Sequence, residues 1–143
     1  MAINNCAMRV LIVEDNLLNQ KMLQLLVRKN GHECDVVSNG LEAVSAVSRV
    51  SYSLILMDIM MPIMDGIEAT IEIRKFDQAI PIIAVTALDI AEFEGRALAA
   101  GMNDYMTKPI SLSILNQKLE RWLPKTSNVL ELIVDNEIRS AEG

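Results

Sequence analysis

Four short, mainly apolar runs and a fifth short segment, Asp104 to Thr107, recur along the chain, and each is followed by a longer segment in which apolar residues return every three or four positions. The runs lie at residues 9–13, 34–37, 54–57, 82–85 and 104–107. The longer segments lie at 16–30, 40–50, 66–76, 89–100 and 111–122. Short apolar runs are typical of strands buried on both faces, whereas the longer spacing is typical of helices. The pattern predicts five strand–helix units.

Residues suited to capping stand at the ends of several predicted helices. Gly31 and Gly101 follow the first and fourth helices, where a left-handed backbone conformation often closes a helix. Asp65 and Ser111 precede the third and fifth helices and can accept hydrogen bonds from free backbone N–H groups there. These residues therefore support the predicted boundaries.

Strict alternation of strands and helices predicts one α/β domain built on a doubly wound parallel sheet. Each right-handed crossover returns the chain beside its own strand, so helices should cover both faces of the sheet. In such sheets ligands bind outside the carboxyl ends of the strands. We therefore look for a functional site among the residues that follow each strand.

Composition narrows the classes of function. Hydrophobic residues make up 51% of the 143 residues and charged residues 22%, which is ample for one buried core. The net charge of −6, without any cluster of lysines and arginines, argues against nucleic-acid binding by this domain. Cys6 and Cys34 match no metal-binding spacing, so we expect a reduced, cytoplasmic setting. No apolar run reaches the roughly 18 residues of a membrane span, and no export signal is evident.

Polar residues gather where the predicted strands end. Glu14 and Asp15 follow the first strand, Asp58 the third, Thr86 the fourth and Lys108 the fifth. The carboxyl ends of parallel strands share one edge, so these side chains should converge. Three carboxylates and one ammonium leave a charge of −2, which a divalent cation would neutralise. Oxygen ligands favour Mg²⁺, and the lack of nearby His or Cys argues against zinc. Asp58, at the end of an apolar run, is the candidate nucleophile.

Four ordered motifs make the chain resemble a response-regulator receiver domain. They are VEDN at 13–16, LILMDIMMPIMDG at 54–66, VTAL at 85–88 and KPI at 108–110. The resemblance covers about residues 9–123 and implies a flavodoxin-like (βα)5 fold with strand order 2-1-3-4-5. The run EDNLLNQ at 14–20 is most similar to receivers of hybrid histidine kinases or phosphorelay proteins. We expect the domain at residues 8–124.

The resemblance implies a phosphoacceptor and a metal site. Asp58 would accept a phosphoryl group from a phosphohistidine on a histidine kinase or a histidine phosphotransfer protein. Asp15, Asp58 and the Met60 backbone carbonyl would bind Mg²⁺, or Mn²⁺ in its place, and Glu14 would act mainly through water. The chain would have no enzymatic activity beyond phosphotransfer to Asp58 and slow loss of that phosphate.

The resemblance also implies a switch. Thr86 and Lys108 would hold oxygens of the phosphoryl group, and Tyr105 would turn inward when Thr86 is drawn toward it. The face made by the fourth helix, fifth strand and fifth helix would change in response. Family members also carry a cis peptide bond before the proline that follows the lysine, which is Pro109 in this chain.

Two other functions compete with signalling. A phosphatase of the haloacid-dehalogenase type also uses an aspartate nucleophile on a parallel sheet with Mg²⁺. Such enzymes carry a second Asp two residues after the nucleophile, where this chain has Met60, and their nucleophile ends the first strand rather than the third. A phosphate-independent interaction domain should have lost part of the acidic pair, Asp58 or Lys108, and all are present.

Two regions keep alternatives open. On the first helix, Leu18, Met22 and Leu25 define one face, whereas Leu23 and Val27 fall on another. The helix is either buried by its neighbours or, with Leu23 and Val27 exposed, is the surface on which the family docks a phosphotransfer helix bundle. The segment at 125–143 is too apolar for a disordered linker, so we expect an extra helix or an interface segment. A homodimer is also open.

Overall fold

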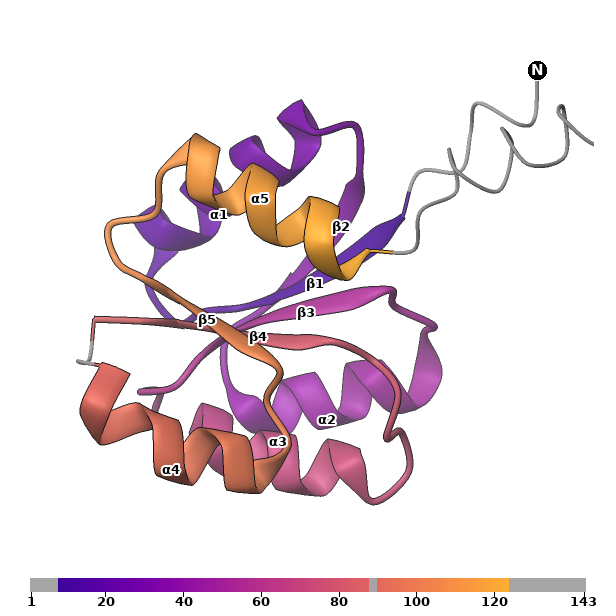
Figure 1. Cartoon of the computed structure of the whole chain (residues 1–143). Helices are drawn as coiled ribbons and strands as arrows, with labels where there is room; N and C mark the ends of the chain where they lie inside the picture. Colours follow the sequence, from indigo (N-terminus) through magenta and orange to yellow (C-terminus); the bar gives the residue numbers. More distant parts are fainter. Residues whose placement is uncertain (1–7, 88–89, 124–143) are drawn as a thin grey trace, which may run out of the picture.

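The computed structural model describes residues 8–87 and 90–123, which form a parallel sheet between two layers of helices (Figure 1). The strands are β1 (Arg9–Val13), β2 (Glu33–Val37), β3 (Leu54–Asp58), β4 (Ile82–Thr86) and β5 (Asp104–Thr107). The helices are α1 (Leu17–Lys29), α2 (Gly40–Arg49), α3 (Gly66–Arg74), α4 (Ile90–Ala100) and α5 (Leu112–Trp122). All the predicted strands and helices are confirmed. The expected extension at 125–143 lies outside the described residues.

The strands pair in the order β2-β1-β3-β4-β5, and every pair is parallel. α1 and α5 cover one face of the sheet, and α2, α3 and α4 cover the other (Figure 1). The doubly wound fold with strand order 2-1-3-4-5 is thus confirmed. The order reverses between β1 and β3, so the residues that follow these two strands lie at the topological switch point, where such folds bind ligands.

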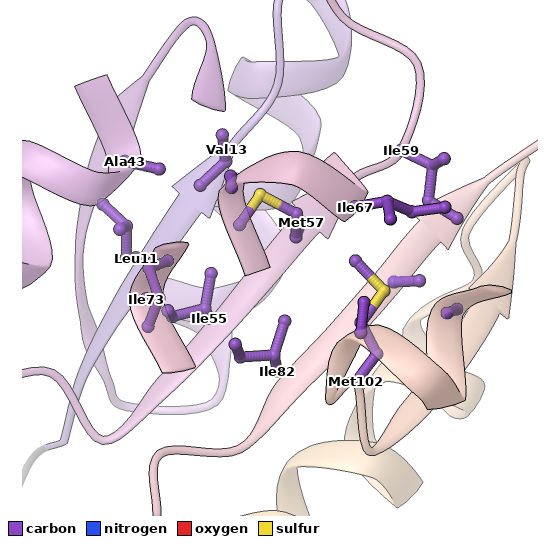
Figure 2. Close-up of a cluster of buried hydrophobic side chains, with 14 of the residues drawn as sticks. Leu11, Val13, Ala43, Ile55, Met57, Ile59, Ile67, Ile73, Ile82 and Met102 are labelled. Atoms are coloured by element: carbon purple, nitrogen blue, oxygen red, sulfur yellow. The ribbon is translucent and has the colours of Figure 1, made fainter. Parts of the chain in front are cut away.

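Alternate residues of the strands enter two separate apolar cores. Leu11 and Ile55 belong to the core under α2, α3 and α4, which Figure 2 shows. Their neighbours Ile12 and Leu56 belong to the core under α1 and α5. Every residue of β3 and β4 is buried, because both strands are central and covered on both faces. The strand that ends in Asp58 is therefore held rigidly.

Local signals fix the helix ends as predicted. Asp65 caps α3 by accepting a hydrogen bond of 2.8 Å from the Glu68 N–H, and Ser111 caps α5 in the same way. Gly31 and Gly101 have φ angles of 82° and 111°, in the left-handed region that favours glycine. A Cβ atom at Gly66 would overlap the Asp58 carbonyl oxygen, so only glycine lets α3 start this close to β3. The cis Lys108–Pro109 bond is also present.

α1 buries a different face from the one expected for a docking surface. Leu23 and Val27 are 2% and 0% exposed and belong to the core between this helix, α5 and the sheet. Leu18 and Leu25 are 76% and 59% exposed instead. The prediction that Leu23 and Val27 lie on an exposed docking surface is wrong, because apolar residues surround the helix and the sheet buries only one side. Within residues 8–87 and 90–123, no helix has the length and apolar character needed to cross a membrane.

Candidate functional site

Three carboxylates meet at the carboxyl edge of the sheet, as predicted. Glu14 and Asp15 follow β1, and Asp58 is the last residue of the neighbouring β3. One oxygen from each carboxylate lies within 4.8 Å of the others. Glu14 and Asp58 are 1% and 5% exposed, whereas Asp15 is exposed. Two buried negative charges in contact need compensation, because burial disfavours the charged form of a carboxyl group.

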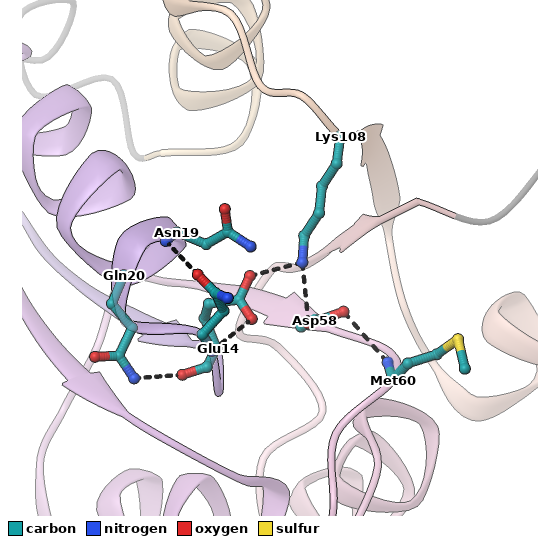
Figure 3. A network of polar contacts seen from close by, with 7 residues as sticks. Glu14, Asn19, Gln20, Asp58, Met60 and Lys108 are labelled. Atoms are coloured by element: carbon teal, nitrogen blue, oxygen red, sulfur yellow. Dashed lines mark hydrogen bonds and ion pairs between the residues drawn. The ribbon is translucent and has the colours of Figure 1, made fainter.

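Lys108 supplies part of this compensation. Its Nζ lies 2.6 Å from Glu14 Oε1 and 3.1 Å from Asp58 Oδ2 (Figure 3). Burial alone would lower the pKa of Lys108, but its contacts with Glu14 and Asp58 outweigh burial and raise the pKa. The ammonium is therefore charged at neutral pH, and it neutralises one of the three negative charges.

Backbone geometry orients the Asp58 carboxylate. Its Oδ1 accepts a hydrogen bond of 3.2 Å from the Met60 N–H, while Oδ2 contacts Lys108 (Figure 3). The Met60 side chain is 65% exposed and points away from the carboxylate (Figure 3). One donor on each oxygen fixes the plane of the carboxylate at the edge of the sheet.

Glu14 has few partners for a buried carboxylate. Its Oε2 accepts a hydrogen bond of 3.3 Å from the Asn16 N–H. Its Oε1 is buried and pairs with the Lys108 ammonium at 2.6 Å, and no other donor reaches it in the described part of the chain. Partial desolvation and the neighbouring Glu14 also raise the pKa of Asp15. The surplus of negative charge on three clustered carboxylates fits a hard divalent cation, so this donor set is suited to Mg²⁺.

The two other residues predicted for the site, Thr86 and Tyr105, lie at different distances from the carboxyl edge of the sheet. Thr86 is the last residue of β4, 2% exposed, and stands at the same edge. Tyr105 is the second residue of β5, half-buried against the core under α4. The structure thus joins Glu14, Asp15, Asp58 and Lys108 directly, whereas Tyr105 lies further from the edge.

Two polar residues that the sequence reasoning did not single out also support the site. Asn16 caps α1 by accepting a hydrogen bond of 3.0 Å from the Asn19 N–H. Gln20 donates from its side-chain amide to the Glu14 carbonyl oxygen, and to Ser38 Oγ at 3.3 Å. The run EDNLLNQ was the available signal, because both residues lie inside it.

Comparison with known proteins agrees with the geometry. The chain matches the family model of the response regulator receiver domain over residues 10–120. The response regulator mcs4 of Schizosaccharomyces pombe is 38% identical over 141 residues, which cover 79% of this chain and 27% of that protein. The sensor protein GacS of Pseudomonas syringae is 41% identical over 121 residues, which cover 81% of this chain and 13% of that protein. The chain therefore spans only about a quarter or less of these relatives.

Two solved structures are similar along most of the chain. The receiver domain of a sensor histidine kinase from Pseudomonas aeruginosa, with a magnesium ion coordinated in its active-site cleft, has a TM-score of 0.77 and 39% identity over 82% of this chain and 98% of that one. The receiver domain of the Saccharomyces cerevisiae response regulator Ssk1, crystallised with the histidine phosphotransfer protein Ypd1, has a TM-score of 0.76 and 36% identity over 81% of this chain and 88% of that one. The phosphatase alternative is not favoured. The chain belongs to the response-regulator receiver family of two-component and phosphorelay signalling.

Proposed function

We propose that Asp58 is the phosphoacceptor of this receiver and takes its phosphoryl group from a phosphohistidine. The observation that carries the proposal is the Asp58 carboxylate itself. It lies at the carboxyl edge of the sheet with Lys108 on one oxygen, the Met60 N–H on the other and two further carboxylates beside it. A carboxylate held in this way is a positioned nucleophile next to an ammonium that can bind phosphoryl oxygens.

Transfer requires mainly position and charge. An Asp58 oxygen bonds to phosphorus while the bond from phosphorus to the donor imidazole nitrogen breaks, and the electron pair leaves with the imidazole. Lys108 and the Thr86 hydroxyl would hold the transferred oxygens. Asp15, Asp58 and the Met60 carbonyl would hold Mg²⁺, or Mn²⁺ in its place, with Glu14 acting mainly through water. The cation would neutralise the charge that develops on the phosphoryl group.

The test is labelling by a small-molecule phosphodonor, measured by intact mass with and without Mg²⁺. We expect wild-type protein to gain one phosphoryl group only with the cation and Asp58→Asn to gain none. Asp65→Asn is the matched control, because it also removes one carboxylate near the edge while asparagine still caps α3. Equal labelling of the Asp58→Asn and control proteins would refute the assignment.

We propose that the phosphorylated domain acts as a switch rather than as an enzyme with a separate substrate. Thr86 would move toward the phosphoryl group, Tyr105 would turn inward, and the face formed by α4, β5 and α5 would change. Mapping amide hydrogen exchange before and after phosphorylation tests this proposal. Changes confined to the loops around Asp58 would contradict it.

We propose α1 as the docking surface for the phosphohistidine donor, using the leucines that the structure exposes. Leu18 and Leu25 lie on the solvent side of α1, and the helix also carries Lys21, Arg28 and Lys29 without any acidic residue. A helical partner with apolar and acidic side chains would complement this surface. The histidine phosphotransfer protein bound to the yeast receiver supports this kind of donor.

Leu18→Asp should slow transfer from a histidine phosphotransfer protein and spare labelling by a small-molecule donor. Leu41→Asp is the matched control, because the Leu41 side chain is exposed on α2, and it should slow neither reaction. Equal slowing with both donors would indicate damage to the fold or to the Asp58 site instead.

We also propose that the receiver domain comprises residues 8–124. We further propose that it works in the cytoplasm, where it would meet its phosphohistidine donors. The segment at 125–143 would then be a separate helix or interface segment. Sedimentation of the whole chain with and without phosphorylation tests whether it forms a homodimer.

A further inference from the structure

A second cluster of carboxylate and lysine lies at the start of β5, at the opposite end of this strand from the Asp58 cluster. Asp104 Oδ1 accepts hydrogen bonds of 2.9 Å from Lys118 Nζ and 2.8 Å from the Tyr105 N–H. Its Oδ2 accepts one of 2.7 Å from Trp122 Nε1. Burial alone would raise the pKa of Asp104, but the bonds from Trp122 and Lys118 outweigh it and lower the pKa. The carboxylate stays ionised and joins β5 to two successive turns of α5.

Lys118 reaches across the edge of the sheet. Tyr105 packs against the core under α4, whereas the next residue, Met106, belongs to the core under α1 and α5. Among the described strands β5 is at the edge of the sheet, so none of them separates α5 from the Tyr105 ring. Lys118 Nζ lies 5.6 Å from the centre of that ring, within range of a cation–π interaction. Its ammonium thus contacts Asp104 and the Tyr105 ring at once.

We propose that Lys118 is a positioning residue for Tyr105: it holds the ring in its half-exposed position and thereby limits the fraction of unphosphorylated molecules in which Tyr105 has turned inward. This inference rests on the proposed function, in which Tyr105 moves when Asp58 is phosphorylated. Asp104 is essential to the argument, because it keeps the ammonium in place at the edge of β5. When the ring turns inward, it therefore leaves the cation behind instead of taking it along.

The expected effect is modest and has a definite direction. A cation–π contact at a partly exposed site changes a two-state population about two- to fivefold. Loss of the Lys118 charge should raise the inward population by that factor. The apparent affinity for a phosphoryl mimic that selects the inward state should rise equally, because apparent affinity scales with the competent fraction.

The experiment uses the whole chain labelled with 3-fluorotyrosine and followed by fluorine NMR. The chain has only two tyrosines, so two resonances are expected. Tyr52 serves as the internal reference, because its hydroxyl bonds to Asp35 at 2.7 Å on the β2 side of the sheet. Titration with beryllofluoride and Mg²⁺ gives the two end positions of the Tyr105 signal and the affinity of the site.

Three variants distinguish an effect of Lys118 on the position of the Tyr105 ring from a nonspecific effect of losing a lysine. Lys118→Met keeps an apolar stem and should move the resting Tyr105 signal toward the bound position, with two- to fivefold tighter beryllofluoride binding. Lys118→Arg can still pair with Asp104 and lie over the ring, so it should behave as wild type. Lys75→Met removes a lysine that pairs with Glu72 at 2.9 Å on α3 and should change neither measurement.

Each failure has its own meaning. If beryllofluoride binds and moves the Tyr105 signal in wild type but Lys118→Met changes neither the resting signal nor the affinity, this inference is wrong and the proposed function stands. If Lys75→Met shifts the Tyr105 signal as much as Lys118→Met does, the shift comes from removing any positive charge and not from the contact with the ring. The inference is then also wrong. If Tyr105 does not respond to beryllofluoride in wild type, both the proposed switch and this inference fail.

Discussion

The two carboxylate–lysine clusters of this domain differ in how completely their charges are satisfied. At the Asp104 cluster, one carboxylate receives three donors, and each of its oxygens is used. At the Asp58 cluster, three carboxylates lie together, and within the described residues the Lys108 ammonium pairs with only two of them, Glu14 and Asp58. In the Asp104 cluster the protein's own donors compensate the carboxylate, whereas the Asp58 cluster needs a further positive charge to compensate its three carboxylates.

This difference separates a structural contact from a ligand site in a chain where both use the same residue types. A carboxylate surrounded by protein donors holds elements together and has no capacity left for a ligand. A group of carboxylates with too few donors costs stability unless a cation binds, and that cost is the driving force for metal binding. The contrast yields predictions that begin with the largest effect.

Removing each lysine should affect the two clusters unequally. Lys108→Met should lower the free energy of unfolding by roughly 3 kcal/mol without Mg²⁺, because buried Glu14 and Asp58 lose the ammonium that pairs with both of them. Lys118→Met should cost at most about 1 kcal/mol, since Trp122 and a backbone N–H still bond to Asp104. Urea denaturation measures both values. Equal losses would mean that the two clusters are compensated alike.

Metal should stabilise only the Asp58 cluster. At about 100 times its Kd, Mg²⁺ should add about 2.7 kcal/mol to the free energy of unfolding. Asp15→Asn should reduce this gain more than Glu14→Gln does, because in the proposed site Asp15 is a direct ligand and would lose an oxygen of the inner coordination shell, whereas Glu14 acts through water. Asp104→Asn is the matched control and should keep the full gain. The reverse order of the Asp15 and Glu14 variants in a metal titration would mean that their roles are exchanged.

Neutralising the Asp104 cluster should weaken the fold without touching the metal. Asp104→Asn should cost about 1 to 2 kcal/mol, because the amide keeps only one accepting oxygen and its NH2 group cannot accept the hydrogen bonds that the other carboxylate oxygen receives. In thermal unfolding, the difference in stability between this variant and wild type should be the same in the presence and absence of Mg²⁺. A difference that depends on Mg²⁺ would show that the two clusters are coupled.

Acid should change the contributions of the two clusters to the free energy of unfolding in opposite directions. This is the smallest of the expected effects. The pKa of Asp104 is lowered from 3.8, so its contribution is present above that pH and is lost as pH falls through the folded-state pKa. The pKa of Asp15 is raised from 3.8, so its contribution is present below that pH and is lost as pH rises through the folded-state pKa. Urea denaturation of Asp104→Asn and Asp15→Asn across this range, without metal, should each remove one of these slopes. Identical profiles would contradict the assignment.

Much of the fold was predictable because the signals that specify it are local. Short apolar runs, capping residues and turn glycines lie within a few positions of the elements they define, and Asp65 shows this most clearly. The convergence of Asp58 with Glu14 was also predictable, because parallel strands bring their carboxyl ends together in any doubly wound sheet.

Contacts set by three-dimensional packing were not predictable. Nothing in the sequence pattern says whether Leu18 or Leu23 faces the sheet, since both sides of α1 carry apolar residues. The bond from Trp122 to Asp104 joins residues 18 positions apart, and it depends on how α5 lies along the edge strand. Such contacts follow from the packing of whole elements, which a single sequence does not reveal.

Trp122 has a practical consequence for anyone who measures this protein. It is the only indole in the chain, so tryptophan emission arises at one place, the junction of α5 with β5. Detachment of the last turn of α5 would change the emission while the sheet stayed folded. An unfolding curve recorded by tryptophan fluorescence therefore reports on this junction. It reports on unfolding of the whole domain only if far-ultraviolet circular dichroism shows the same transition. A gap between the two curves would measure how loosely α5 is held.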